Sequence, residues 1–178
     1  MKKIAIIHDW LTGMRGGEKV LEIFCELFPN ADIFTLIHIP GSVSKIIEDR
    51  KIQTSFLQKI PLAMKRYRSF LPLFPLAIEG FDLRGYDVVV SSSHCVAKGA
   101  LTSPATIHIC YCHTPMRYVW EHYNTYFGNG KKGLVSRFLM PPIAHYLRMW
   151  DVASSNRVDY FVANSYNVAN RIKKYYKR

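Results

Sequence analysis

The first thirty residues constrain the fold more than any other part of this sequence. An apolar run at 3–8 predicts a buried strand, and the glycines of 13–17 lead directly into a predicted amphipathic helix over 17–28. This order is typical of the start of an α/β fold, and it points the helix N-terminus at the carboxyl edge of the sheet. The unit therefore predicts an anion site beside Gly16 and Gly17. Its spacing differs from the dinucleotide fingerprint, so no nicotinamide or flavin cofactor is expected.

Apolar runs alternate with helical patterns along the whole chain. Strands are predicted at 3–8, 32–37, 51–54, 87–92, 106–112 and 159–164, and helices at 17–28, 42–49, 61–71, 134–154 and 166–176. The clearer strands carry few charges, as expected when helices cover both faces of a parallel sheet. The predicted fold class is therefore α/β, a Rossmann-like parallel sheet forming a single domain over 1–178. Pro141 and Pro142 predict a break or restart in the long helix that contains them.

Length and cysteine content bound the compartment. At 178 residues the chain is long enough to bury a core without disulfides or metal. No secretory signal precedes its four cysteines, which favours a reducing cytoplasm. No apolar run approaches the length of a membrane span, so membrane contact is expected only as peripheral association at the inner face of the cell membrane.

The net charge of +11 is unevenly distributed. Three stretches without an acidic residue hold 13 of the 24 basic residues: Lys59, Lys65, Arg66 and Arg68; Lys131, Lys132, Arg137 and Arg148; and Arg171, Lys173, Lys174, Lys177 and Arg178. Such stretches attract a nucleic acid, an anionic bilayer or a phosphorylated substrate, or they form a solvated basic face. No recognition helix or aromatic RNA motif accompanies them, so nucleic acid is not expected as a partner.

Segment 56–76 mixes large apolar side chains with cations. In a helix over 61–71, Met64, Tyr67 and Leu71 share one face. Two interpretations stay open: the apolar face packs on the sheet as in an ordinary crossover helix, or the segment lies on an anionic membrane surface. The second interpretation assigns the membrane contact to Lys59, Lys65, Arg66 and Arg68.

The strand at 106–112 leads into a second group of chemically active residues. Strand alternation places Cys110 and Cys112 on one face, and Pro115 ends the strand, so His113 emerges at the carboxyl edge of the sheet. The one-residue spacing of the cysteines does not arrange zinc ligands, so both are interpreted as buried strand residues and no metal is expected. The residues that follow offer a cation and aromatic surfaces to a sugar or phosphate: Arg117, Tyr118 and Trp120.

A serine run ends in a histidine after the strand at 87–92, at Ser91, Ser92, Ser93 and His94. The run lacks the G-x-S-x-G elbow of serine hydrolases, which disfavours nucleophilic catalysis. Its hydroxyls are interpreted as groups that hydrogen-bond the local backbone at the end of the strand.

Several pieces of sequence occur in a familiar order. They are His8-Asp9-Trp10-Leu11 with Gly16-Gly17-Glu18, the run from Tyr111 to Trp120, and Asp151 with Arg157-Val158-Asp159 and Asn164-Ser165. Together they resemble the N-terminal half of retaining GT-B glycosyltransferases of family four, closest to its mannosyltransferase-like members. The resemblance covers essentially the whole chain. It implies an acceptor-side domain, with the nucleotide-sugar-binding C-terminal domain absent from this chain.

The resemblance also implies a reaction. A hexose, with mannose favoured, would pass from a nucleotide sugar such as GDP-mannose to a lipid-linked or polysaccharide acceptor with retention and without a metal or cofactor. His113 matches the family's cleft histidine, the implied catalytic residue, which orients the donor sugar or the acceptor. The positions implied to contact the donor diphosphate or the acceptor are Gly16, Gly17, Asp9, Trp10, Arg117, Tyr118 and Trp120.

These 178 residues alone are expected to be inactive as a transferase. Two other functions stay open. One is a non-catalytic subunit that binds a sugar phosphate or nucleotide, and the less favoured one is a basic nucleic-acid-binding domain.

Overall fold

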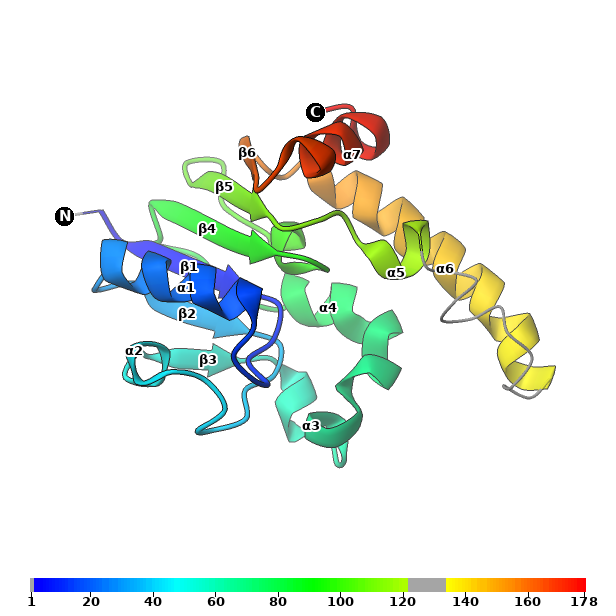
Figure 1. Ribbon diagram of the computed structural model, residues 1–178, viewed down its shortest axis with the longest axis horizontal. Coiled ribbons are helices and arrows are strands. Elements are labelled where there is room, and N and C mark those ends of the chain that lie inside the picture. The colour runs from blue at the N-terminus through cyan, green and yellow to red at the C-terminus, as the bar shows by residue number, and fades with distance from the viewer. Residues whose placement is uncertain (1, 122–133) are drawn as a thin grey trace.

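The computed structural model describes residues 2–121 and 134–178, which form one six-stranded parallel sheet with helices on both faces (Figure 1). The strands are β1 (Ile4–His8), β2 (Asp32–Thr35), β3 (Ile52–Thr54), β4 (Val88–Ser93), β5 (Ile107–Cys112) and β6 (Tyr160–Ala163). Their order is β3-β2-β1-β4-β5-β6, and each neighbouring pair is parallel. The order reverses beside β1, as in Rossmann-like folds. The predicted fold class and all the predicted strands are therefore confirmed.

The helices vary widely in length. They are α1 (Gly16–Leu27), α2 (Lys45–Glu48), α3 (Ala63–Arg66), α4 (Phe74–Glu79), α5 (Arg117–Trp120), α6 (Leu134–Ser155) and α7 (Tyr166–Tyr176), with 3₁₀ turns η1 (Phe56–Lys59), η2 (Tyr67–Leu73) and η3 (Ala97–Gly99). The predictions of α1, α6 and α7 are confirmed to within one residue at each end. The sequence did not predict α4, α5 or the 3₁₀ turns, because three to seven residues are too few for a helical period to show.

Two apolar layers cover the sheet, one on each face. Ile6 of β1 belongs to the layer that includes Leu21 of α1, whereas its neighbour Ile7 belongs to the layer that includes Phe74 of α4 and Leu147 of α6. Successive strand residues point to opposite faces, which explains this division. Figure 1 shows α1 lying across β1 and β2. The carboxyl edge of the sheet is therefore bordered by α1 on one side and by α4 to α6 on the other.

The predicted helix over 61–71 is wrong in its form. Leu62 has a positive φ of 65°, so regular structure begins only at Ala63, and it changes to a 3₁₀ turn at Tyr67. Left-handed backbone at a non-glycine residue interrupts a helix and carries local strain. Tyr67 and Leu71 are nevertheless buried in the core, as the crossover interpretation of this segment requires.

The predicted break at Pro141 and Pro142 is also wrong, because α6 runs without interruption from Leu134 to Ser155. Each proline removes one intrahelical hydrogen bond. The following turns are held by Ala144 and Leu147, which pack in the core. Within the described ranges, no helix is both long and apolar enough to cross a membrane. The basic residues Lys131 and Lys132, and the side chain of Arg137, lie outside the described part of the chain.

A buried ion pair joins the C-terminal helices to the sheet. Lys98 of η3 is 1% exposed, and its Nζ lies 3.0 Å from Asp151 Oδ1 and donates to Ser154 Oγ at 2.7 Å. The other Asp151 oxygen accepts hydrogen bonds from Trp120 Nε1 at 2.8 Å and from the Tyr176 hydroxyl at 2.9 Å. One carboxylate therefore ties α5, α6 and α7 to the turn that follows β4.

Candidate functional site

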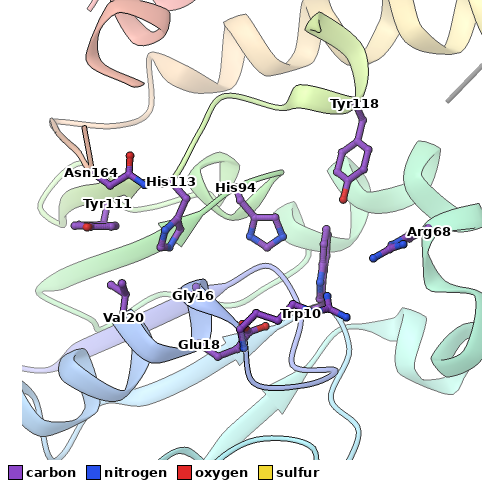
Figure 2. A pocket seen from close by; sticks show the side chains of 12 residues that line it. Trp10, Gly16, Glu18, Val20, Arg68, His94, Tyr111, His113, Tyr118 and Asn164 are labelled. Carbon is purple, nitrogen blue, oxygen red and sulfur yellow. The ribbon is translucent and has the colours of Figure 1, made fainter. Parts of the chain in front are cut away.

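A pocket of about 430 Å³ opens at the carboxyl edge of the sheet. We call it the histidine pocket. Figure 2 shows His94 and His113 facing it after β4 and β5, with Tyr118 reaching in from α5 and Arg68 from η2. The opposite wall is formed by the β1–α1 loop and the start of α1, through Trp10, Arg15, Gly16, Gly17 and Glu18.

A chain of side-chain contacts links His8 and His113 beneath the pocket. His8 Nδ1 lies 3.1 Å from Ser92 Oγ, and Ser92 Oγ lies 2.9 Å from His113 Nε2. The parallel register of β1 and β4 sets the first contact, since it pairs His8 with Ser92. A serine hydroxyl has one proton, so Ser92 donates to one imidazole and accepts from the other. The tautomers of His8 and His113 are therefore linked.

His94 forms an ion pair with the buried carboxylate of Asp9. Its Nδ1 lies 3.0 Å from Asp9 Oδ2, and the same carboxylate accepts backbone N–H groups of residues 94–97 at 2.6–2.9 Å. Burial disfavours the charged imidazole, but the facing charge of Asp9 outweighs it and raises the pKa of His94. The His94 side chain is 25% exposed, so this geometry presents an imidazole with a raised pKa to the pocket.

His113 has the opposite electrostatic character. Burial first, and then the nearby charges of His8 and His94, lower its pKa to about 4. At neutral pH His113 is therefore a neutral imidazole, and it stands beside His94, whose pKa is raised, with the two ring centroids 6.4 Å apart. A neutral ring can exchange hydrogen bonds with a sugar hydroxyl, and a fixed cation can stabilise a developing negative charge.

We expect the two histidines to titrate separately in the intact chain. Nuclear magnetic resonance of ¹⁵N-labelled imidazoles at pH 6 should show His94 protonated and His113 neutral, because their pKa values are shifted in opposite directions. A titration midpoint for His113 near the ordinary value of about 6.5 would contradict the electrostatics derived from this geometry.

The start of α1 brings bare backbone close to the histidines. A Cβ atom added at Gly17 would lie 3.4 Å from His8 Cε1 and 3.9 Å from His113 Nε2, so glycine leaves this part of the pocket open. Gly16 is exposed at the first position of the helix. The carboxylate of Glu18 accepts the backbone N–H of Arg15 at 3.0 Å and is itself buried. The predicted anion site thus contains one acidic side chain among its basic groups.

The structure brings some of the predicted site residues together and separates others. Trp10, Gly16, Gly17, His113 and Tyr118 line the histidine pocket. Asp9, Arg117 and Trp120 are not among its lining residues.

Two local reasons explain this separation. Both oxygens of the buried Asp9 carboxylate are engaged by residues 94–97, so it acts on the pocket through His94. In α5 each residue turns by about 100°, so Tyr118 faces the pocket while its neighbours point elsewhere. Arg117 is exposed, and Trp120 stacks on Tyr175 at a centroid distance of 4.6 Å.

The four cations assigned to a membrane surface differ in the hollows that they line. Arg68 lines the histidine pocket, and together with Lys65 and Arg66 it also lines a neighbouring hollow. Lys59 is exposed but lines neither.

The strand cysteines and serines serve the interior of the sheet. Cys110 and Cys112 are fully buried, and within the described ranges no cluster of His, Cys, Asp or Glu is arranged to hold a metal. The expectation that the serines bond the local backbone is wrong for two of them. Ser91 Oγ lies 2.8 Å from His108 Nε2, and Ser92 contacts two histidines. The neighbouring parallel strands supply these partners. Ser93 fulfils the expectation, because its Oγ accepts the backbone N–H of Lys98 at 3.2 Å.

Sequence reasoning missed His94 and Glu18 as pocket residues, and it missed His8 beneath the pocket. A usable signal exists for His94: Asp9 directly follows the predicted strand 3–8, His94 lies two residues beyond the predicted strand 87–92, and these two strands are neighbours in the sheet. No comparable signal marks Glu18, whose position depends on the turn that precedes α1.

Comparisons with known proteins give little beyond the fold. No protein-family model and no curated protein matches the sequence. Among solved structures, the chain is similar to the apo form of the lipopolysaccharide outer core galactosyltransferase WaaB, with a TM-score of 0.48 and 16% sequence identity. The similarity covers 97% of this chain and 42% of the galactosyltransferase. The chain therefore spans less than half the length of that protein.

Proposed function

We propose that this chain is the acceptor-side domain of a retaining glycosyltransferase. In this proposal a hexose, with mannose favoured, passes from a nucleotide sugar such as GDP-mannose to a lipid-linked or polysaccharide acceptor. The donor would be held mainly by a second domain outside these residues. The sequence motifs that resemble family four support the proposal, and so does the position of the histidine pocket at the carboxyl edge of a Rossmann-like sheet, where such sheets bind ligands.

One observation carries the proposal: two histidines whose pKa values are shifted in opposite directions, His113 downward and His94 upward, face the same pocket beside a glycine turn. Transfer of a sugar from a nucleotide requires a group that orients a hydroxyl and positive charge that stabilises the departing diphosphate. His113 serves the first role as the catalytic residue. His94, held in its charged form by Asp9, serves the second, together with the N-terminus of α1 at Gly16 and Gly17.

The leaving diphosphate would accept the acceptor's proton in this reaction, so the domain needs no carboxylate base of its own. The described lining agrees with this scheme, because Glu18 lies 3.8 Å from His8 Nε2 and accepts the N–H of Arg15. Glu18 is thus occupied in holding the first turn of α1. Tyr118 offers an aromatic surface to a sugar ring.

The proposal places the protein in the cytoplasm at the inner face of the cell membrane. Leu62 and Met64 are exposed next to the basic residues 65 and 66, a combination suited to a bilayer surface. A lipid-linked acceptor would reach the histidine pocket from this side, since Arg68 borders both regions.

Replacing His113 by alanine in the complete protein that carries this chain tests the function directly. We expect transfer of labelled sugar from a panel of nucleotide sugars to a membrane-lipid extract to fall about a hundredfold, because the orienting imidazole is lost. Donor binding should remain. His145→Ala, an exposed histidine on α6, is the matched control and should retain full transfer.

Two other results would change the proposal. If His113→Ala leaves the rate of transfer unchanged, the assignment to a glycosyltransferase would stand but the assignment of His113 as the catalytic residue would be wrong. Absence of transfer from every donor, in a folded complete protein that still binds nucleotide sugars or sugar phosphates, would favour the non-catalytic binding subunit.

A further inference from the structure

A second hollow lies beside the histidine pocket and is strongly basic. It has a volume of about 370 Å³ and lies between the β1–α1 loop and segment 64–69. We call it the basic hollow. Its lining includes Arg15, Lys65, Arg66 and Arg68, and no acidic residue of the described chain lines it. The histidine pocket, by contrast, balances its cations with Glu18.

The basic hollow and the histidine pocket share part of their lining. Arg15 and Arg68 line both of them, and Figure 2 shows Arg68 pointing toward the histidine pocket from its outer side. A molecule with its reacting part beside His113 could therefore place a second group among the four cations.

The local fold holds these cations in place. Tyr67 and Leu71 anchor the segment in the core, so residues 65, 66 and 68, which point away from that anchor, are exposed around it. Lys65 and Arg66 form the last positions of α3, and its start is set by the left-handed backbone of Leu62. A fixed group of like charges repels itself, so binding an anion relieves the repulsion.

The groups present suit a phosphate better than a carboxylate. Guanidinium groups bind phosphate oxygens in pairs, and a lysine adds a point charge. Thr12, which also lines the hollow, has a buried hydroxyl for which the described chain supplies no hydrogen-bond partner. Several cations and an available hydroxyl match the many acceptor oxygens of a phosphate or diphosphate.

We propose that the basic hollow is a subsite for the phosphate or diphosphate group of the acceptor. This inference rests on the proposed function and narrows it: the acceptor is a phosphorylated molecule whose sugar or hydroxyl lies beside His113 while its phosphate lies among Arg15, Lys65, Arg66 and Arg68. The same cations then serve as a ligand site at the edge of the pocket.

Lys59 makes this proposal testable, because it belongs to the same basic stretch but lies outside the hollow. Calorimetric titration of the chain with inorganic pyrophosphate at low ionic strength measures the dissociation constant. In the double variant Lys65→Gln/Arg66→Gln this constant should be higher than in the parent by about tenfold or more, because two charge-assisted contacts are lost. Lys59→Gln should change it less than about twofold, because an exposed charge contributes little. All three side chains are exposed, so the variants should fold; circular dichroism checks this.

Vesicles distinguish the sources of the phosphate. Sedimentation with neutral phosphatidylcholine vesicles that carry a few per cent of polyprenyl diphosphate should depend on Lys65 and Arg66 but not on Lys59 if the acceptor is lipid-linked. Competition by soluble sugar phosphates without vesicle binding would assign a soluble acceptor to the same subsite.

Two outcomes would overturn the subsite. The first is pyrophosphate binding that is unchanged in the double variant or weakened equally in Lys59→Gln. The second is binding to phosphatidylglycerol vesicles that depends equally on all three cations, which would assign them to a membrane surface. Failure of the proposed function can be distinguished from failure of the subsite. A complete protein without transfer activity would still show pyrophosphate binding that depends on Lys65 and Arg66.

Discussion

Replacing Lys98 by methionine is expected to lower the free energy of unfolding by about 3–5 kcal/mol, because it leaves the carboxylate of Asp151 buried without its cation. Methionine matches the length of the lysine stem, so the change removes charge with little change in packing. Unfolding in urea, followed by circular dichroism, measures the loss. It is a large fraction of the roughly 5–15 kcal/mol that keeps a typical domain folded.

Lys59→Met at an exposed position is the control and should change stability by less than about 0.5 kcal/mol. A loss below about 1 kcal/mol for Lys98→Met would mean that Asp151 is stabilised mainly by Trp120 and Tyr176.

Asp9→Asn is expected to cost about 3 kcal/mol or more, because an amide cannot replace a carboxylate that accepts backbone N–H groups on both oxygens. The side-chain NH₂ of asparagine would face two of those donors. The same substitution removes the charge that raises the pKa of His94, so burial alone would then lower it. Urea unfolding and an imidazole titration of the variant measure the two effects.

The sign of the pH effect follows from the two pKa shifts. Burial works to raise the pKa of Asp9, but His94 and the backbone donors outweigh burial and hold it well below its usual range, so its contribution is present above about pH 4 and is lost as the pH falls further. The raised pKa of His94 contributes below about pH 6.5 and is lost as the pH rises through its folded value. The pair therefore stabilises the parent most between about pH 4 and 6.5.

In Asp9→Asn this maximum should disappear. Asp82→Asn is the matched control, since Asp82 is 61% exposed in its side chain and pairs only with the exposed Arg84 among the described contacts. It should leave the stability curve nearly unchanged. An Asp9→Asn variant that keeps the parent's stability and its His94 titration would show that the carboxylate does not hold that ring in its charged form.

The sequence predicted those strands and helices in which burial requires a long pattern of apolar residues. The six strands and the helices α1, α6 and α7 follow from apolar runs and helical periods, and their positions were predicted within a few residues. The segment around Leu62 was not, because a left-handed residue that is neither glycine nor asparagine leaves no mark in composition. The prolines of α6 misled for a related reason: their effect on a helix depends on how firmly later turns, such as that of Leu147, are packed.

The location of the candidate site could be predicted from the sequence, but the full set of residues that line it could not. His113 and the glycine turn were found because both lie at the ends of predicted strands. His94 was set aside with the serine run, although its partner Asp9 had been marked as a ligand-binding residue in its own right. Which of two polar residues is buried and which one faces the pocket depends on the register of β1 against β4, and a single sequence does not specify it.

The hydroxyl of Ser92 couples the protonation of the two imidazoles that it contacts below the pocket. Because it offers one proton to two imidazoles, a proton captured by His113 forces the hydroxyl to turn and compels His8 to accept where it had donated. A change in the protonation of His113 is thus carried one strand inward, to a ring that is fully buried and that lies against the first turn of α1. Ser92 links the two rings because its hydroxyl has two orientations, and the protonation of His113 selects one of them.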